Sequence, residues 1–193
     1  MRGRLLDATV ECLVEKGAGE LSTNDVVRKA GVSRGALAHH FPTKAELLSA
    51  AALHLVADRV AEFRSTFLAL PPAKRTVPRA LDLLWSFFEG DTFTALLDLI
   101  VASRTNAELR GVLQDGPDLI VDVTIDVFVE LFPEMAGNAM AEPLVRATLT
   151  LFTGMAVTMI VDGDRHGHHA EMRRLVSAMG AGLLPSNGGA AQP

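Results

Sequence analysis

Apolar side chains recur at intervals of three and four residues along most of this chain. That spacing is the repeat of an α-helix with one buried face, whereas the alternating pattern that marks a β-strand is missing. We therefore expect an all-α fold of about nine helices. The predicted helices cover residues 4–16, 23–30, 34–41, 44–70, 76–89, 91–103, 106–132, 142–162 and 166–184, and the 106–132 helix is interrupted near Gly116 and Pro117.

Residues that start or stop helices stand at the expected ends of these segments. Gly17 and Gly19 stop the first helix, and Pro42 ends the 34–41 helix. A hydroxyl group at a helix start can accept a hydrogen bond from a first-turn amide that has no other partner. The predicted caps are Ser22 or Thr23 for the 23–30 helix, Ser33 for the 34–41 helix and Thr43 for the 44–70 helix.

Composition indicates a globular protein of the cytoplasm. The chain has 193 residues, of which 49% are hydrophobic, so it can bury a substantial core. The single cysteine, Cys12, lies on the apolar face of the first helix; we expect it in the core of a protein from a reducing compartment. The longest apolar run, residues 147–161, is shorter than the roughly 18 to 20 residues that span a bilayer. The N-terminus lacks the apolar stretch of a signal peptide, and residues 185–193 are expected to be disordered.

The net charge of −5 is unusual for a nucleic-acid-binding protein, so its distribution matters. Residues 1–48 contain seven lysines or arginines and six acidic residues, which gives +1, while the rest of the chain carries −6. This asymmetry permits nucleic-acid contact at the N-terminal end only.

The segment from residue 23 to 41 has the order of a helix-turn-helix. A helix over 23–30 is followed by a glycine-containing turn at 31–33 and a second short helix over 34–41, the arrangement that places one helix in the DNA major groove. Small residues would let this second helix approach base edges, and Arg34 can pair with guanine through two hydrogen bonds. Leu37 and Phe41, four residues apart, should face inward.

This segment resembles the TetR family of bacterial regulators. Members of that family share a pattern similar to Gly-Val-Ser-x-Gly-x-Leu-x-x-His-Phe-x-x-Lys-x-x-Leu. The resemblance covers about the first 48 residues. The matching residues here are Thr23, Val26, Gly31, Val32, Ser33, Gly35, Leu37, His40, Phe41, Lys44 and Leu47.

The resemblance implies roles for individual residues of the head. Phosphate contacts would come from Thr23, His40 and Lys44, whereas Arg34, Gly35, Ala36 and His39 would face the bases. Ala38 departs from the family, which usually carries at this position a tyrosine that reaches the DNA backbone. The implied domains are a DNA-binding head at 1–43 and a ligand-binding and dimerisation body at 44–184, followed by the tail at 185–193.

The 142–162 helix is apolar nearly all round, which predicts burial on more than one side. Family members pair through their last two long helices, and a homodimer is the interpretation we favour; the alternative is a monomeric bundle with this helix at its centre. The predicted interface residues are Leu144, Thr148, Leu151, Phe152, Met155 and Met159, with Leu175 and Met179 of the final helix.

Aromatic and aliphatic residues gather between the 44–70 helix and the final helices. They predict a pocket for a small, mainly apolar effector, although ordinary core packing explains each residue equally well. The predicted lining is Trp85, Phe88, Phe93, Leu97, Ile100 and Phe128. We expect ligand entry to shift the 44–70 helix and to change the separation of the two recognition helices in a dimer.

The functional interpretation is a ligand-responsive repressor that binds a palindromic double-stranded operator as a homodimer. We expect no enzymatic activity, because no nucleophile elbow, phosphate-binding loop or catalytic carboxylate pair is present. We also expect no cofactor and no membrane association. The alternative function is a helical small-molecule-binding or scaffolding protein without DNA activity. His166, His168, His169 and Glu171 could bind a metal ion, but a solvated loop is the favoured interpretation.

Overall fold

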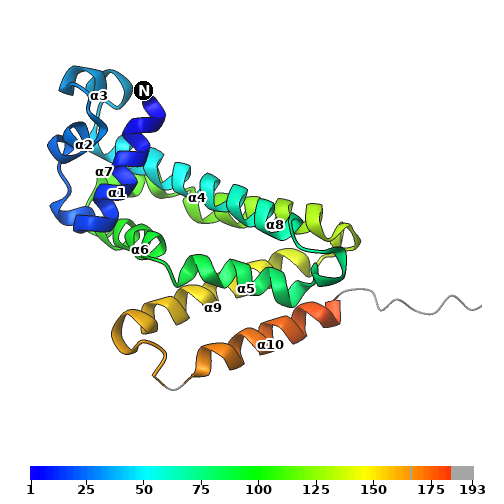
Figure 1. The fold of residues 1–193 in the computed structure, drawn as a ribbon. Helices are drawn as coiled ribbons and strands as arrows, with labels where there is room; N and C mark the ends of the chain where they lie inside the picture. The colour runs from blue at the N-terminus through cyan, green and yellow to red at the C-terminus, as the bar shows by residue number, and fades with distance from the viewer. Residues whose placement is uncertain (166, 184–193) are drawn as a thin grey trace, which may run out of the picture. The chain divides into compact units, whose positions relative to one another are not determined.

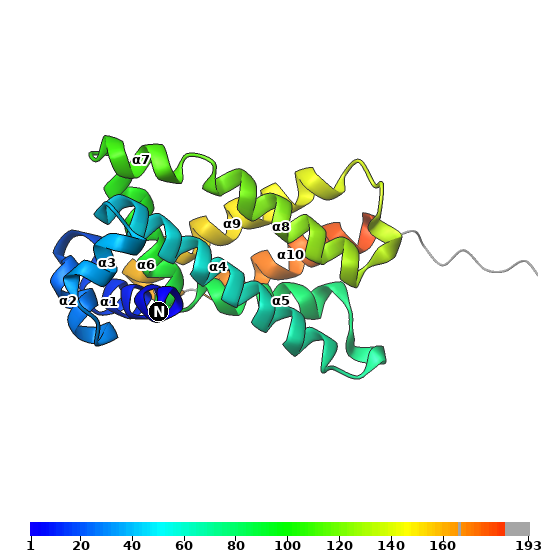
Figure 2. The same ribbon diagram turned by 90° about the horizontal axis from the view of Figure 1, so that it is seen from above.

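The computed structural model describes residues 1–165 and 167–183, and all the regular structure within them is helical. Figure 1 and Figure 2 show the helices from two directions. The predicted disordered tail at 185–193 lies outside the described residues. The α-helices are α1 (Arg2–Glu20), α2 (Thr23–Ala30), α3 (Arg34–His40), α4 (Lys44–Leu68), α5 (Val77–Phe88), α6 (Asp91–Ser103), α7 (Ala107–Leu113), α8 (Gly116–Leu131), α9 (Ala141–Asp162) and α10 (His168–Leu183), with short 3-10 helices η1 (Pro72–Lys74) and η2 (Pro133–Met135).

Two of the predicted helix boundaries differ from those in the structure. The first helix breaks at Gly17 as predicted, because φ 73° and ψ 168° are not helical, but a further helical turn after this kink extends α1 to Glu20. The 106–132 segment is two helices, and Gly116 and Pro117 begin α8 instead of interrupting one helix. Proline is well tolerated in a first helical turn because its missing N–H would have no partner there.

The described chain divides into two compact units. Unit 1 comprises residues 1–61 and 89–119, and unit 2 comprises residues 62–88 and the described residues from 120 onward. The helix-turn-helix segment therefore packs in one unit with α6 and α7. The functional boundary at residue 43 stays a prediction, because the division into units reflects packing and not activity.

The core of unit 1 forms where α1 packs against α2 and α6. Both views show α1, α2 and α3 next to one another (Figure 1, Figure 2). Leu5, Val26 and Leu47 are fully buried, and Cys12 is 1% exposed, as the sequence predicted for a core residue. Burial raises the pKa of the Cys12 thiol, since the charged thiolate is poorly solvated there.

The kink in α1 holds that helix against α6. The backbone amide of Ala18 donates a hydrogen bond of 3.1 Å to Oδ2 of Asp98 on α6. Gly17 comes so close to the same carboxylate that a Cβ atom at this position would lie 2.5 Å from Asp98 Oδ2. Its backbone conformation is one that only glycine adopts readily.

Unit 2 is built around an aromatic core. The Trp85 ring packs edge to face on Phe152 at a centroid distance of 5.2 Å and stacks with Phe88 at 6.3 Å. A second aromatic group joins Phe67 to Phe132 at 5.6 Å. These contacts agree with the alternative interpretation of the aromatic residues, which is ordinary core packing.

Among the described residues, α9 is the one helix long and apolar enough to cross a membrane by length and composition. Core helices of water-soluble proteins pass the same test. In its most apolar window only 28% of the residues are buried within the chain. Much of the apolar surface of α9 is therefore uncovered in the single chain.

Gly17→Ala should destabilise unit 1 by about 1–3 kcal/mol, the usual cost of a backbone conformation reserved for glycine, and the clash with Asp98 adds to it. Urea-induced unfolding, followed by circular dichroism, measures the loss. Gly19→Ala is the matched control, because Gly19 has no positive φ and a Cβ atom there meets nothing within 4 Å. Equal stability of the two variants would contradict the role assigned to the kink.

Candidate nucleic-acid interface

The turn between α2 and α3 is fixed by caps on both sides. Ser22 caps α2, because its Oγ accepts a hydrogen bond from the backbone amide of Asp25. In return, the backbone amide of Ser22 donates a hydrogen bond to the Asp25 carboxylate. Gly31 ends α2 in the left-handed conformation, with φ 63°. From α1, the guanidinium of Arg4 donates to the carbonyl of Ala30 at 2.5 Å and so holds the end of α2.

The short helix α3 has one buried side and one exposed side. Ser33 Oγ accepts the amide of Ala36, which confirms the predicted cap. Leu37 and Phe41 are 7% and 4% exposed, as predicted for the inward face. The exposed residues of this helix are Arg34, Gly35, Ala38 and His39.

The structure brings the predicted DNA-binding residues together around α3. Arg34, Gly35, His39 and Lys44 are exposed, and Thr23, Ala36 and His40 are half-buried. The rings of His39 and His40 pack edge to face at 5.3 Å. Lys44 is the first residue of α4, and its Nζ lies 3.5 Å from the carbonyl oxygen of Ala18 in α1. The predicted Thr43 cap is confirmed by its hydrogen bond of 3.1 Å from the amide of Glu46.

Ion pairs within unit 1 explain how an almost neutral segment can present positive charge. Lys16 and Arg28 each lie 2.7 Å from Asp25, and Lys29 lies 2.6 Å from Glu15 and 3.2 Å from Glu11. These acids are thus balanced by bases of α1 and α2. Among the described residues, no side-chain ion pair or hydrogen bond is seen for Arg34.

A sequence signal that the net charge concealed lies in residues 26–45. This stretch contains no aspartate or glutamate, but it includes Arg28, Lys29, Arg34 and Lys44. It corresponds to most of α2, the turn, α3 and the start of α4. A count over this window would have placed the positive charge more sharply than the count over residues 1–48.

The Asp25 carboxylate holds the start of α2 electrostatically. A hydrogen bond from Lys16 and a second from the Ser22 hydroxyl, of 2.7 Å and 2.6 Å, lower the pKa of Asp25 well below its usual range. A hydrogen bond to Glu15 is the main reason why the pKa of Lys29 is raised. Both shifts favour the charged forms and tie α1 to α2.

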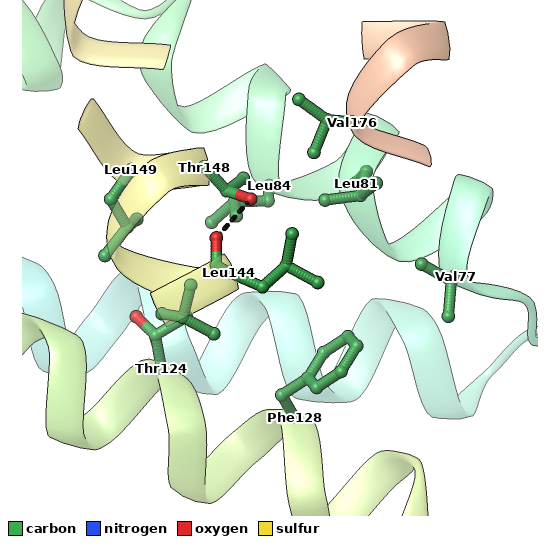
Figure 3. A pocket seen from close by; sticks show the side chains of 10 residues that line it. Val77, Leu81, Leu84, Thr124, Phe128, Leu144, Thr148, Leu149 and Val176 are labelled. Carbon is green, nitrogen blue, oxygen red and sulfur yellow. Dashed lines mark hydrogen bonds between the residues drawn. The ribbon is translucent and has the colours of Figure 1, made fainter. Parts of the chain in front are cut away.

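A second candidate site is a small cavity inside unit 2 (Figure 3). Its volume is about 40 Å³. The Thr148 hydroxyl donates a hydrogen bond of 2.8 Å to the Leu144 carbonyl of the same helix, so its proton is already engaged (Figure 3). The cavity is lined by Val77, Leu81, Leu84, Thr124, Phe128, Leu144, Val145, Thr148, Leu149 and Val176.

Of the predicted ligand-binding residues, only Phe128 lines this cavity. Trp85 and Phe88 are buried in the aromatic core of the same unit. Phe93, Leu97 and Ile100 belong to α6 in unit 1, where Phe93 is buried and Ile100 is 51% exposed. The three residues of α6 therefore belong to another unit than the cavity. Helical spacing identified apolar residues but could not tell which helices pack together.

The predicted dimer residues differ in burial and fall into three groups. Thr148, Phe152 and Met155 are buried inside their own chain. Leu175 and Met179 are 58% and 52% exposed; Leu144, Leu151 and Met159 are half-buried. A helix that is apolar all round offers two faces, and spacing alone could not tell which of them packs inward. Among the side chains of these two helices that the structure describes, the large apolar ones that are exposed are Val157, Ile160, Val161, Met172, Leu175 and Met179.

The possible metal cluster near the start of α10 does not assemble in the described residues. His168 lies 3.8 Å from Glu171 at the surface, but His169 points into unit 2 and packs against Trp85 at 5.4 Å. His166 lies outside the described residues. The favoured interpretation of this cluster was a solvated loop; His169 departs from it because it is 8% exposed.

Comparison with known proteins places the helix-turn-helix segment in a known family. The family model described as "Bacterial regulatory proteins, tetR family" matches residues 5–51, which run from α1 into α4. The HTH-type transcriptional regulator CymR from Pseudomonas putida is 40% identical over 113 residues, which are 58% of this chain and 56% of CymR. The chain spans little more than half the length of the curated relatives it matches.

Solved structures share the fold over nearly the whole chain. A TetR-family transcriptional regulator from Streptomyces coelicolor matches with a TM-score of 0.66 over 95% of this chain and 99% of its own, at 17% identity. The multidrug binding protein EbrR, solved in complex with imidazole, gives a TM-score of 0.62 over 95% and 94%, at 19% identity. At such low identity the likeness is one of fold alone.

Asp25→Asn should lower the melting temperature at pH 7, and the difference from wild type should shrink as the pH falls below about 4. The reason is that a carboxylate with a lowered pKa stabilises the fold above the pKa of the unfolded chain and loses that effect as it becomes protonated. Thermal melts between pH 7 and pH 3 measure both trends. Glu20→Gln, at an exposed acid of the same unit, is the control; a difference that is constant across pH would contradict the prediction.

Proposed function

Because the chain belongs to the TetR family of bacterial regulatory proteins, we propose that it is a transcription repressor that binds its operator as a homodimer and is released by a small, mainly apolar ligand. The observation that carries this proposal is the exposed side of α3, where Arg34, Gly35, Ala38 and His39 face away from the buried Leu37. The regulator acts in the cytoplasm, where the operator is.

DNA contact follows from the chemistry of that exposed side. Recognition helices contact base edges through residues near their N-termini, and Arg34 is the first residue of α3. Gly35 and Ala38 add little bulk, so the helix can lie close to the floor of the groove. Thr23, His40 and Lys44 surround α3 and would contact phosphates, which set the register without reading the sequence.

Homodimerisation is supported by exposed apolar side chains on α9 and α10. Val157 and Val161 are one turn apart on α9 and are 42% and 84% exposed; Leu175 and Met179 are one turn apart on α10. Exposed apolar side chains that gather into one patch mark an interaction site in soluble proteins, and we infer such a patch on these two helices. A dimer would present two recognition helices about 34 Å apart, one turn of DNA, and so favour a palindromic operator.

Ligand response is supported by the cavity of unit 2 and by its small size. Ligand sites usually measure roughly 300–1,000 Å³, whereas this cavity measures about 40 Å³. An effector would therefore have to part α5, α8, α9 and α10, which line the cavity, and binding would favour an expanded conformation over the present one. The lining is almost wholly aliphatic and aromatic, which suits an apolar ligand. EbrR, which has the same fold, is named as a multidrug binding protein.

Arg34→Ala should weaken operator binding by about 1–3 kcal/mol, roughly fivefold to more than a hundredfold, because it removes a contact to a base. Fluorescence anisotropy measures the loss of affinity, with DNA duplexes from the promoter regions next to the gene that encodes this chain. Lys74→Ala is the matched control, since Lys74 is an exposed base in unit 2, outside the proposed interface. If Arg34→Ala binds as tightly as Lys74→Ala, the proposed interface is wrong and the scaffolding alternative is favoured.

Ile160→Asp should shift the protein from dimer to monomer, since it would place a charge in the proposed α9–α10 interface, where Ile160 is 57% exposed in the single chain. Analytical ultracentrifugation measures the mass in solution. Ile100→Asp is the matched control, because Ile100 is 51% exposed on α6 of the other unit. A monomeric wild type, or dissociation caused by Ile100→Asp instead, would contradict this interface.

A further inference from the structure

Three side chains of unit 1 converge at the surface between α1 and α4. His54 Nε2 on α4 lies 2.7 Å from Oδ1 of Asp7 on α1 and 3.4 Å from Oδ2 of Asp58, one turn further along α4. The three ligand atoms all lie within 4.8 Å of one another. Asp7 and Asp58 side chains are 59% and 55% exposed, and that of His54 is 26% exposed.

This set of donor atoms has the composition of a metal site, and one of its separations matches that of two ligands on one ion. Imidazole nitrogen and carboxylate oxygen bind divalent transition metals at about 2.0–2.2 Å. Two ligands at that distance from one tetrahedral or octahedral ion are therefore separated by roughly 3.0–3.5 Å. The 3.4 Å separation between His54 and Asp58 lies in this range, and the 2.7 Å separation from Asp7 is slightly shorter.

The two carboxylates also supply the charge that such an ion requires. Both approach the same atom, His54 Nε2, yet an imidazole N–H can donate well to only one acceptor at a time. A divalent cation at this position would bind both carboxylates and the ring nitrogen simultaneously, and water would complete its coordination. One nitrogen ligand among the three favours zinc or a neighbouring transition metal over magnesium.

We propose that Asp7, His54 and Asp58 form a binding site for a divalent transition-metal ion that clamps α1 to α4. The ion would join α1 to α4 through Asp7 and His54, which are 47 residues apart in the sequence. The site lies within unit 1, apart from the exposed side of α3, and neither the proposed operator contact nor the unit 2 cavity depends on it.

Isothermal titration of the metal-free full-length protein with Zn²⁺ tests the site. We expect one ion per chain. Asp7→Asn, Asp58→Asn and His54→Gln should each lower the affinity for Zn²⁺ by about tenfold or more, because even the loss of a group that hydrogen-bonds to a metal ligand has an effect of this size. Zn²⁺ should raise the melting temperature of the wild type but not that of His54→Gln. Titration with Mg²⁺ should give far weaker binding.

His168→Gln is the matched control, because His168 also lies beside a carboxylate, Glu171, at 3.8 Å, but on α10. This variant should bind Zn²⁺ like the wild type. Circular dichroism of each metal-free variant verifies the fold, and three separate substitutions prevent one misfolded variant from deciding the result. Absence of saturable Zn²⁺ binding by the wild type overturns the proposal, and so does undiminished binding by all three variants; operator binding without metal is unaffected in either case.

Discussion

Burial of Leu37 and Phe41 beneath α3 is the constraint on which the whole interface depends. A helix of seven residues cannot remain folded alone in water, because its nucleation costs more than its few hydrogen bonds return. Two buried side chains hold the inner face against the rest of unit 1, and the Ser33 cap satisfies the first turn. Because the inner face is fixed, the outer face is fixed as well, and Arg34 projects from a rigid surface.

The same logic extends one layer further from the interface. The helix α2 supports α3 and is held by the Ser22 and Asp25 cap, by the Lys16 ion pair from α1 and by the Arg4 hydrogen bond to its last residue. The acids that lower the net charge of this region are therefore structural. They neutralise Lys16, Arg28 and Lys29, which hold α1 and α2 together. Among the described residues, no ion pair is seen for Arg34 or Lys44, the two bases next to the exposed side of α3.

Sequence reasoning predicted the caps, the turn and the buried side of α3 because their signals are local. Capping hydroxyls, the turn glycine and the spacing of Leu37 and Phe41 act over a few residues, and each has its effect whatever lies elsewhere. The body was different: Phe152 and Ile160 are both apolar residues of α9, but the first is fully buried and the second is 57% exposed. Which face turns inward depends on helices distant in sequence. The residues that line the cavity depend on the same packing, so of the six predicted only Phe128 was found there.

The helix α4 gives the proposed ligand response a physical route. Its residues 44–61 belong to unit 1 and its residues 62–68 to unit 2, so one continuous helix runs through both units. Phe67, in the last turn of α4, is 1% exposed and packs on Phe132. The ring centroid of Phe132 lies 4.9 Å from that of Phe128, which lines the cavity. A ligand that displaces Phe128 would therefore press on the end of α4 through two aromatic contacts. In the proposed response, α4 itself would carry this displacement toward Lys44 and Leu47 at its other end, because both ends belong to one helix.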